Sequence, residues 1–334
     1  MNNMRKNQKW NKSIITCTMK KKISILVPCY NEEKSLPLLY EALQQMAAEN
    51  ASYEWELLFV NDGSMDNTLS VLEQLRAKDS RCCYVDLSRN YGKEAAMLAG
   101  FDYVTGDATV IIDADLQDPP SLIPQMLAKW KEGYDDVYAQ RKTRGKESWL
   151  RKRLSMSYYR LLTKSSRIDV LPNVGDFRLL DRQCIEALKS LREQGRYTKG
   201  MFCYIGFRKT EISFDRQDRA VGDSKMSYGS LFRLAMEGMM SYTTAPLRFA
   251  SILGLVISFV TFLYALWILA KTLIWGDPVA GFPTLIIVIL FLGGVQLLSL
   301  GIIGEYLGRV YNETKNRPVY FARTYNGERV EKQK

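Results

Sequence analysis

Short apolar runs alternate with polar loops and amphipathic segments through the first part of the chain. Four of these runs have the length of buried strands, and apolar residues recur at helical spacing between them. The runs are Ile23–Val27, Trp55–Val60, Cys82–Leu87 and Thr109–Ile112, and the clearest helical segments are Leu36–Ala48 and Glu94–Val104. Strands that alternate with helices in this way predict an α/β fold with a mostly parallel sheet covered by crossover helices. We assign residues 20–226 to this domain.

A polar loop follows each of the four predicted strands. The loops are Tyr30–Glu32, Asp62–Ser64, Arg89–Lys93 and Asp113–Gln117. Ligands of parallel sheets gather beyond the carboxyl ends of the strands, so these loops are predicted to converge on one cleft. Asp66 is placed to cap the helix after the second strand. The chain has neither a G-x-G-x-x-G after the first strand nor a P-loop, which disfavours dinucleotide enzymes and P-loop NTPases.

The fourth predicted strand ends in the motif Asp113-Ala114-Asp115. Two carboxylates one residue apart are common at strand ends, but here they follow a buried strand and face other polar loops. Together with Gln117 they supply hard oxygen ligands suited to Mg²⁺ or Mn²⁺, which usually also bind substrate phosphates. The sequence therefore predicts a divalent cation and a phosphorylated ligand at this edge of the sheet, with Arg219 and Lys225 neutralising the remaining phosphate charge.

The last third of the chain carries two long apolar segments, at 249–273 and 282–304. As a helix, the uncharged stretch Phe249–Ala270 would be about 33 Å long at ~1.5 Å per residue, enough to cross a hydrocarbon core of about 30 Å. Buried core helices are the alternative. We expect a two-helix transmembrane hairpin, preceded by an interfacial amphipathic helix at 227–248. Basic residues concentrate in the tail at 305–334, which predicts both termini and the catalytic domain on the cytoplasmic side of the cell membrane.

Charge and composition narrow the chemistry. The net charge of +10 indicates an anionic partner, and the apolar segments favour a membrane surface or a phosphorylated substrate over nucleic acid. The chain has no histidine, which removes the usual general base and the usual zinc ligand. Its six cysteines lack C-x-x-C spacing and are expected to be reduced thiols. Residues 1–19 are expected to be a disordered arm or to reflect an upstream start.

Four motifs resemble those of the family 2 inverting glycosyltransferases. They are Val27–Glu33, Val60–Ser64, Asp113–Pro120 and Arg219–Lys225. The likeness is strongest to polyprenyl-phosphate glycosyltransferases, a group that includes dolichyl-phosphate mannose synthases and bactoprenol glucosyl or N-acetylglucosaminyl transferases. It covers about residues 20–320, including the paired apolar segments. The resemblance implies a GT-A (Rossmann-like) fold, and the absence of Q-x-x-R-W sets the chain apart from the polymer-forming relatives.

The resemblance also implies roles for single residues. The implied donor-binding residues are Pro28, Tyr30, Glu32, Asp62, Lys93, Asp113, Ala114, Arg219 and Lys225; the implied metal ligands are Asp113, Asp115 and Gln117. The acceptor phosphate is expected at Arg141, Arg151, Arg153 and Ser155, in a basic segment interleaved with aromatic residues that would lie at the membrane surface or remain a solvated helix. The implied catalytic residues are Asp115 and Asp176, the latter facing the acceptor.

The sequence thus predicts a membrane-bound enzyme that transfers a hexose, glucose or N-acetylglucosamine, from a UDP-sugar to undecaprenyl phosphate. A phosphate monoester with a second pKa near ~6 is already mostly ionised and needs little help from a general base, in keeping with the missing histidine. Two alternatives stay open: a transferase of the same fold acting on a saccharide or diacylglycerol hydroxyl, and a non-catalytic scaffold or sugar-nucleotide sensor. The sequence leaves the oligomeric state open, a homo-oligomer included.

Overall fold

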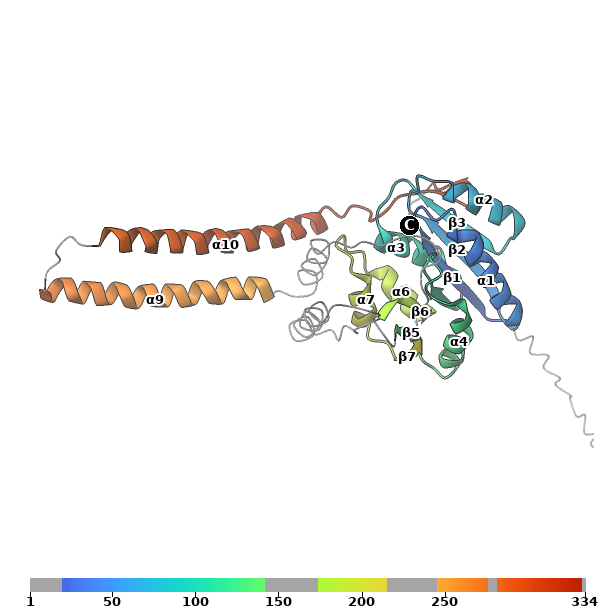
Figure 1. Cartoon of the computed structure of the whole chain (residues 1–334), viewed down its shortest axis with the longest axis horizontal. Coiled ribbons are helices and arrows are strands. Elements are labelled where there is room, and N and C mark those ends of the chain that lie inside the picture. Colours follow the sequence, from blue (N-terminus) through green and yellow to red (C-terminus); the bar gives the residue numbers. More distant parts are fainter. Residues whose placement is uncertain (1–19, 142–173, 215–244, 276–280, 332–334) are drawn as a thin grey trace, which may run out of the picture.

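The structure is a computed structural model that describes residues 20–141, 174–214, 245–275 and 281–331. These residues form an α/β domain from which two long helices project (Figure 1). The predicted arm at 1–19 and most of the predicted interfacial helix at 227–248 lie outside the described residues.

The domain is built on one nine-stranded sheet with the order β7-β5-β6-β4-β1-β2-β3-β8-β9. Its strands are β1 (Lys22–Cys29), β2 (Glu54–Asn61), β3 (Cys82–Leu87), β4 (Ala108–Ile111), β5 (Asp136–Arg141), β6 (Val174–Asp181), β7 (Lys209–Phe214), β8 (Ala322–Tyr325) and β9 (Glu328–Arg329). The central strands β4, β1, β2 and β3 are parallel, and antiparallel pairs extend the sheet on both sides. The predicted α/β fold with a mostly parallel sheet is confirmed in a sheet that is mixed because of its flanking strands.

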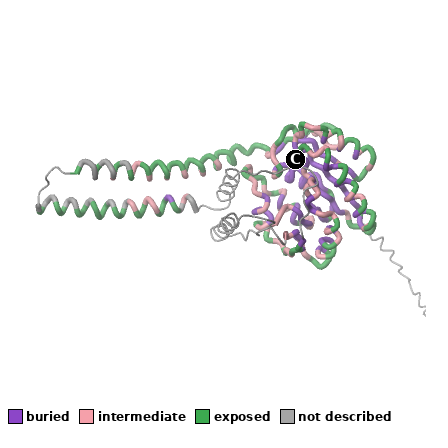
Figure 2. The backbone as a smooth tube through the Cα atoms, viewed as in Figure 1, coloured by how far each residue is buried: buried purple, intermediate pink, exposed green. Residues whose placement is uncertain are grey.

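Helices cover both faces of this sheet. They are α1 (Ser35–Glu49), α2 (Thr68–Lys78), α3 (Lys93–Tyr103), the 3-10 helix η1 (Pro120–Leu122), α4 (Ile123–Lys131), α6 (Arg182–Ser190) and α7 (Thr198–Tyr204). Helices α1, α2 and α4 pack on one face and α3, α6 and α7 on the other, so two apolar cores sandwich the sheet. Figure 2 shows burial concentrated in the domain and exposed residues along the projecting helices.

Residue alternation along the strands explains the two cores. Ile23 and Ile25 of β1 point into one core, whereas Leu26 points into the other. Because both faces are buried, the central strands are continuous apolar runs, which is the pattern expected of parallel strands between two helical layers. The carboxyl ends of these strands therefore lie together at one edge of the domain, where the polar loops begin.

The two projecting helices are α9 (Ala245–Trp275) and α10 (Phe282–Thr314), which lie side by side (Figure 1). Among the described residues, Phe291–Thr314 is the one helical segment long and apolar enough to cross a membrane, and Phe249–Tyr264 is a shorter apolar helix. The two predicted spans are thus both helical. Only one described segment is long and apolar enough to cross a membrane, so the transmembrane hairpin stays a prediction. Helix α10 extends into the predicted basic tail.

Two local features differ from the simplest expectation. The cap position of α2 is Asn67, without a side-chain cap bond, and Asp66 instead lies one residue earlier, where its Oδ1 accepts from the Thr68 N–H at 3.0 Å. The residues after α10 return to the domain, where β8 pairs antiparallel with β3. The C-terminal residues are therefore part of the sheet that positions the polar loops.

Candidate active site

One cavity of about 260 Å³ lies beyond the carboxyl ends of the central parallel strands. Eight of its lining residues are ones that we predicted from the sequence: Pro28, Tyr30, Glu32, Asp62, Lys93, Asp113, Ala114 and Asp115. The lining also includes Cys29, Asn90, Gly92 and Ala96, which were not predicted. Asn90 and Gly92 belong to the loop between β3 and α3, so the signal that could have found them is the polar loop itself. The structure thus brings the strand-end loops to one point.

The loop after β2 is bound tightly to the loop after β3. The Tyr91 N–H donates to Oδ1 of Asp62 at 2.7 Å, and the Gly92 N–H donates to Oδ2 at 2.9 Å. Next to Asp62, Gly63 has a φ of +62°, and a Cβ there would lie 2.4 Å from the carbonyl carbon of Arg89. The backbone approach therefore requires glycine, and Asp62 is fixed from two sides.

The loop after β1 is joined to the same region. Asn31, with a positive φ of 56°, donates its N–H to Oγ of Ser64 at 2.9 Å, and its side-chain Oδ1 accepts from the Met65 N–H at 2.8 Å. The Glu32 N–H donates to Oγ1 of Thr68 at 2.8 Å. A non-glycine residue at positive φ is uncommon and is held in place here by its partners on the β2 loop. The two loops form one rigid wall of the cavity.

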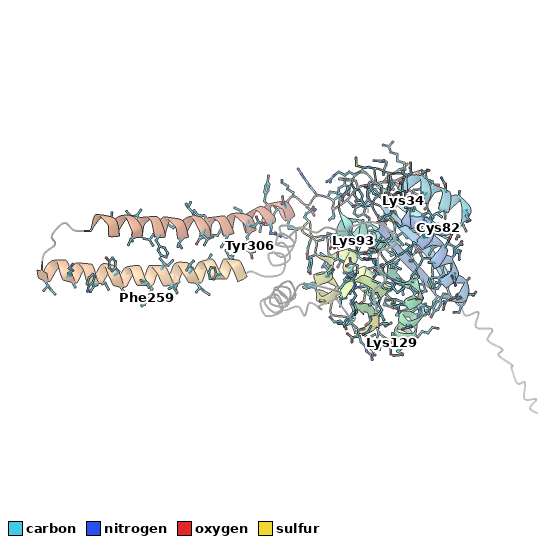
Figure 3. All side chains as sticks on the ribbon, viewed as in Figure 1. Lys34, Cys82, Lys93, Lys129, Phe259 and Tyr306 are labelled. Carbon is cyan, nitrogen blue, oxygen red and sulfur yellow. The ribbon has the colours of Figure 1, made fainter. Side chains whose placement is uncertain are left out.

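Lys93, the first residue of α3, lines the cavity and binds two carboxylates (Figure 3 labels Lys93). Its Nζ lies 2.6 Å from Oδ1 of Asp113 and 2.6 Å from Oδ2 of Asp176. Asp176 comes from β6, which runs antiparallel to β4 with Ile111 opposite Arg178. Continuing that register two residues past the end of β4 places Asp176 opposite Asp113. The sheet thus sets the two carboxylates side by side, and Lys93 lies between them.

These contacts determine the charge of Asp176. Burial alone would raise the pKa of this carboxyl, but the cations of Lys93 and Lys199 and the hydrogen bond from Lys93 lower it below its usual value. Burial would lower the pKa of Lys93, but the two carboxylates raise it instead. At neutral pH the group is therefore an ion triad, and Asp176 is a weak proton acceptor.

Two other carboxylates of the cavity have raised pKa values. Burial raises the pKa of Asp62, against the hydrogen bonds from Tyr91 and Gly92. Burial also raises the pKa of Glu32, with smaller contributions from the charges of Asp115 and Asp113. The carboxylates of the first and fourth strand-end loops therefore repel one another, and a cation in the cavity would relieve this repulsion.

The D-x-D motif continues into a tight turn. Leu116 has a positive φ of 60°, and this conformation directs the Gln117 N–H toward Oδ1 of Asp115 at 3.1 Å. Gln117 is buried and is not among the lining residues of the cavity. No group of three or more acidic, cysteine or histidine side chains within the described part of the chain forms a ready metal site. The donor set of Asp113 and Asp115 fits a cation that takes its other ligands from substrate phosphates and water, as Mg²⁺ commonly does.

Glu94 is a partly buried acid that the sequence did not single out. Its carboxylate accepts from the Thr198 N–H at 3.0 Å and so ties α3 to α7. Burial, with a further contribution from the charge of Asp176, raises the pKa of Glu94 to about 7. Only its position beside Lys93 in the sequence could have drawn attention to it.

The predicted acceptor residues are largely outside the described chain. Arg151, Arg153 and Ser155 fall in the undescribed segments, as do the predicted donor-binding residues Arg219 and Lys225. Arg141 ends β5, beside the loop-facing end of β6, and its guanidinium reaches Gly175 next to Asp176. Its buried Nε has no hydrogen-bond partner among the described residues. Of the predicted acceptor residues, Arg141 is thus placed near the ion triad.

Comparisons with known proteins agree on one family. The glycosyl transferase family 2 profile matches residues 24–189. Putative glycosyltransferase CsbB of Bacillus subtilis (strain 168) is 45% identical over 304 residues, covering 91% of this chain and 92% of that protein. A bactoprenol glucosyl transferase of Shigella phage SfX is 41% identical over 303 residues, covering 91% of this chain and 99% of that protein.

Among solved structures, glucosyl-3-phosphoglycerate synthase from Mycobacterium tuberculosis, in complex with Mn²⁺, UDP and phosphoglyceric acid, has a TM-score of 0.49 and 18% identity over 66% of this chain and 76% of that chain. The sequence relatives match this chain over nearly their whole length. With its strand-end loops gathered around one acidic cavity, the chain belongs to glycosyl transferase family 2.

Proposed function

We propose that this protein transfers a hexose from a UDP-sugar to undecaprenyl phosphate, with inversion at the anomeric carbon. The observation that carries the proposal is the convergence of eight predicted residues on one cavity. The chain is also 41% identical, over nearly all of its length, to a protein named bactoprenol glucosyl transferase. Glucose and N-acetylglucosamine are the leading sugars.

The strand-end loops would bind the donor. Tyr30 is 43% exposed at the mouth of the cavity, where its ring can stack on the uracil base, and Asp62 is fixed behind it. Lys93 supplies the positive charge that a diphosphate requires. Arg219 and Lys225 are proposed to close over the donor phosphates.

A Mg²⁺ or Mn²⁺ ion would be held by Asp113 and Asp115. Bound there, the ion would stabilise the negative charge that develops on the UDP leaving group. Gln117, buried behind the turn, would support Asp115 through its backbone N–H rather than from within the cavity lining.

In the reaction, a phosphate oxygen of the acceptor attacks the anomeric carbon, the bond from that carbon to the UDP oxygen breaks, and UDP leaves with the bonding pair. Such an acceptor is already ionised near neutral pH and gives up no proton. A hydroxyl acceptor would need a base, and Asp176 is poorly suited to that role because Lys93 keeps its pKa low. We propose that Asp176 instead holds Lys93 in place, while Arg141 and the basic segment after it receive the acceptor phosphate.

Helices α9 and α10 would anchor the enzyme in the cell membrane, as a hairpin with both termini and the catalytic domain in the cytoplasm. Large apolar side chains along both helices are exposed, Leu255 at 73% and Leu297 at 72%, which a lipid environment would cover. This arrangement supports an acceptor that reaches the domain from the bilayer.

Purified protein in detergent, incubated with undecaprenyl phosphate, Mn²⁺ and a panel of nucleotide sugars, tests the proposal by the mass of the lipid product. We expect one sugar to give a product that survives mild base and is cleaved by mild acid. Chelation with EDTA should stop turnover, and added Mg²⁺ or Mn²⁺ should restore it.

The Asp115→Asn variant should lose turnover by at least about 100-fold while its thermal transition is retained. The matched control is Glu132→Gln, which removes an exposed carboxylate at the far end of α4. Wild-type rates in the Asp115→Asn variant would rule out the metal role. If a glycosylated diacylglycerol were the sole product, the acceptor would be a lipid hydroxyl and not polyprenyl phosphate.

A further inference from the structure

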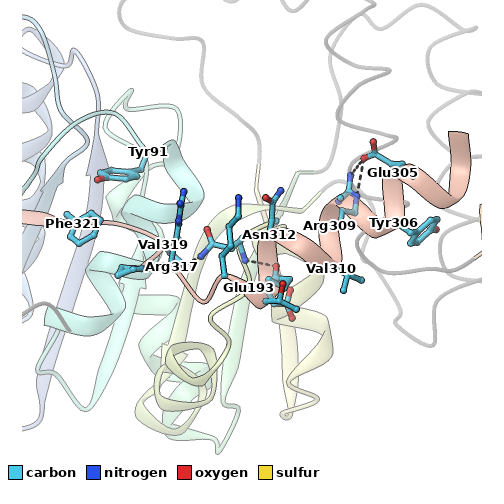
Figure 4. Close-up of a pocket in the computed structure, with 18 of the residues that line it drawn as sticks. Tyr91, Glu193, Glu305, Tyr306, Arg309, Val310, Asn312, Arg317, Val319 and Phe321 are labelled. Atoms are coloured by element: carbon cyan, nitrogen blue, oxygen red, sulfur yellow. Dashed lines mark hydrogen bonds and ion pairs between the residues drawn. The ribbon is translucent and has the colours of Figure 1, made fainter.

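The chain that follows α10 forms a strap along the domain, which we define as residues 315–325. The strap runs from the end of α10 to the end of strand β8 and lines a second cavity of about 1420 Å³ (Figure 4). Tyr91 and Phe321 lie on the same wall of this cavity. Tyr91 belongs to the loop 88–92 that also lines the donor cavity through Asn90 and Gly92. The two cavities therefore share this loop as a wall.

The strap is anchored to the domain at its middle. The Tyr320 hydroxyl donates to Oδ2 of Asp102 at 2.7 Å, and Arg192 binds both oxygens of the same carboxylate at 2.7 Å each. Asp102 lies on α3, the helix that begins with Lys93. Tyr320 is 3% exposed, so this part of the strap is packed as firmly as the core. Tyr320 therefore fixes the position of the strap residues that follow it.

The next residues of the strap, Phe321 and Arg323, bind the loop 88–92 at Ser88. The Ser88 N–H donates to the backbone oxygen of Phe321 at 2.9 Å, and the Arg323 guanidinium donates to the backbone oxygen of Ser88 at 2.9 Å. Both backbone groups of Ser88 are thus bound by the strap. Three residues further on, the same loop binds Asp62 through Tyr91. Arg323 therefore contacts the base of the loop whose tip fixes Asp62.

Arg323 also binds a buried carboxylate of strand β3. Its Nη1 lies 3.4 Å from Oδ2 of Asp86, which is 2% exposed. The other oxygen of Asp86 accepts from Nδ2 of Asn61 at 2.8 Å. Asn61 is the residue before Asp62, and its own oxygen accepts from the Ser64 N–H at 3.2 Å. The guanidinium thus supports Asp62 by two separate routes, one through the backbone of Ser88 and one through Asp86 and Asn61.

We propose that Arg323 is a positioning residue for nucleotide binding: from the C-terminal strap it holds the loops that place Asp62, so that donor affinity depends on chain beyond the membrane helix. The inference rests on the proposed function, because it assumes that the cavity at Asp62 receives the nucleotide. Arg323 does not line that cavity and acts only through its neighbours. Its effect is therefore expected on donor binding and not on the acceptor.

The test compares Arg323→Ala with Arg323→Lys and with the control Arg329→Ala, which removes an equal charge from the exposed end of β9. UDP binding is measured by calorimetry on the full-length protein in detergent with Mn²⁺, and the KM for each substrate by initial rates. Loss of a partly exposed guanidinium contact should weaken UDP binding about 3- to 10-fold and raise the donor KM by a similar factor. Arg323→Lys should have a UDP affinity and a donor KM between those of the wild type and Arg323→Ala. Arg329→Ala should bind UDP like the wild type, and the acceptor KM should be unchanged in all variants.

Three outcomes would overturn the inference. The first is equal UDP binding by the wild type and Arg323→Ala, and the second is equal weakening in Arg323→Ala and Arg329→Ala, which would indicate charge alone. The third is a lower thermal transition in Arg323→Ala with unchanged donor KM, which would make the residue merely structural. Wild-type protein that does not bind UDP would overturn the proposed function as well, so the two failures are distinguishable.

Discussion

Gly63→Ala is the sharpest test of how the donor loops are packed. An ideal Cβ at this position would lie 2.4 Å from the carbonyl carbon of Arg89 and 2.5 Å from the nitrogen of Asn90. Both are backbone atoms, so no side chain can rotate away. A real Cβ essentially never lies within 3.0 Å of a heavy atom, and the loop 88–92 must therefore move by at least 0.6 Å.

The cost follows from what that movement breaks. The hydrogen bonds from Tyr91 and Gly92 to Asp62, now 2.7 and 2.9 Å, would lengthen past the usual limit of about 3.2 Å. Asp62 is 3% exposed, so water replaces them poorly. The lost bonds to a charged group cost about 1–3 kcal/mol, and the positive φ adds about 1 kcal/mol. We expect about 2–4 kcal/mol less stability and at least about 10-fold weaker UDP binding.

The matched control is Gly206→Ala. Gly206 has a φ of +71°, but its nearest neighbour to an added Cβ is 3.8 Å away, so this variant carries the backbone cost of about 1 kcal/mol without the clash. Chemical unfolding in detergent and UDP calorimetry, run on both variants, separate the two effects. A Gly63→Ala protein that unfolds like the control and binds UDP within about twofold of the wild type would refute the packing argument.

Two further predictions concern the residues at the start of α3. Lys93→Met should abolish transfer and cost about 1–3 kcal/mol, because it leaves the 11%-exposed Asp176 without its partly exposed cation, and the double variant with Asp176→Asn should regain most of that stability but not activity. An unaltered unfolding curve for the single variant would contradict the ion triad. Glu94, with its pKa raised to about 7, binds a proton more tightly in the folded than in the unfolded state. Stability should therefore fall as the pH rises from about 4.5 to 7. Glu94→Gln should flatten that slope in thermal scans, and an equal slope in both proteins would show that another group titrates.

The sequence predicted the central sheet well because its signals there are local. The predicted Cys82–Leu87 matches β3 residue for residue, and Ile23–Val27 lies within β1. Both strands are buried on both faces, so continuous apolar runs mark them clearly. Each run ends at the residues that carry the candidate chemistry, and the placement of the loops followed from parallel strands alone.

Long-range pairings could not be predicted in the same way. The attachment of β8 to β3 joins residues more than two hundred positions apart, through a short strand that follows α10 and has no clear apolar pattern. Arg323 and Tyr320 looked like members of a basic tail for that reason. Their roles depend on Asp86 and Asp102, two buried acids whose partners no local pattern reveals.

The ion triad shows why the candidate chemistry needs both kinds of information. The D-x-D motif could be predicted from a buried strand ending in carboxylates, but the sequence gives no reason to place Asp176 beside Asp113. That proximity arises because β6 inserts antiparallel between β4 and β5, so that its beginning meets the end of β4. Lys93 then binds both acids, which lowers the pKa of Asp176 and makes this carboxylate a weak base. An enzyme arranged in this way is suited to an acceptor that arrives already ionised, as a lipid phosphate does.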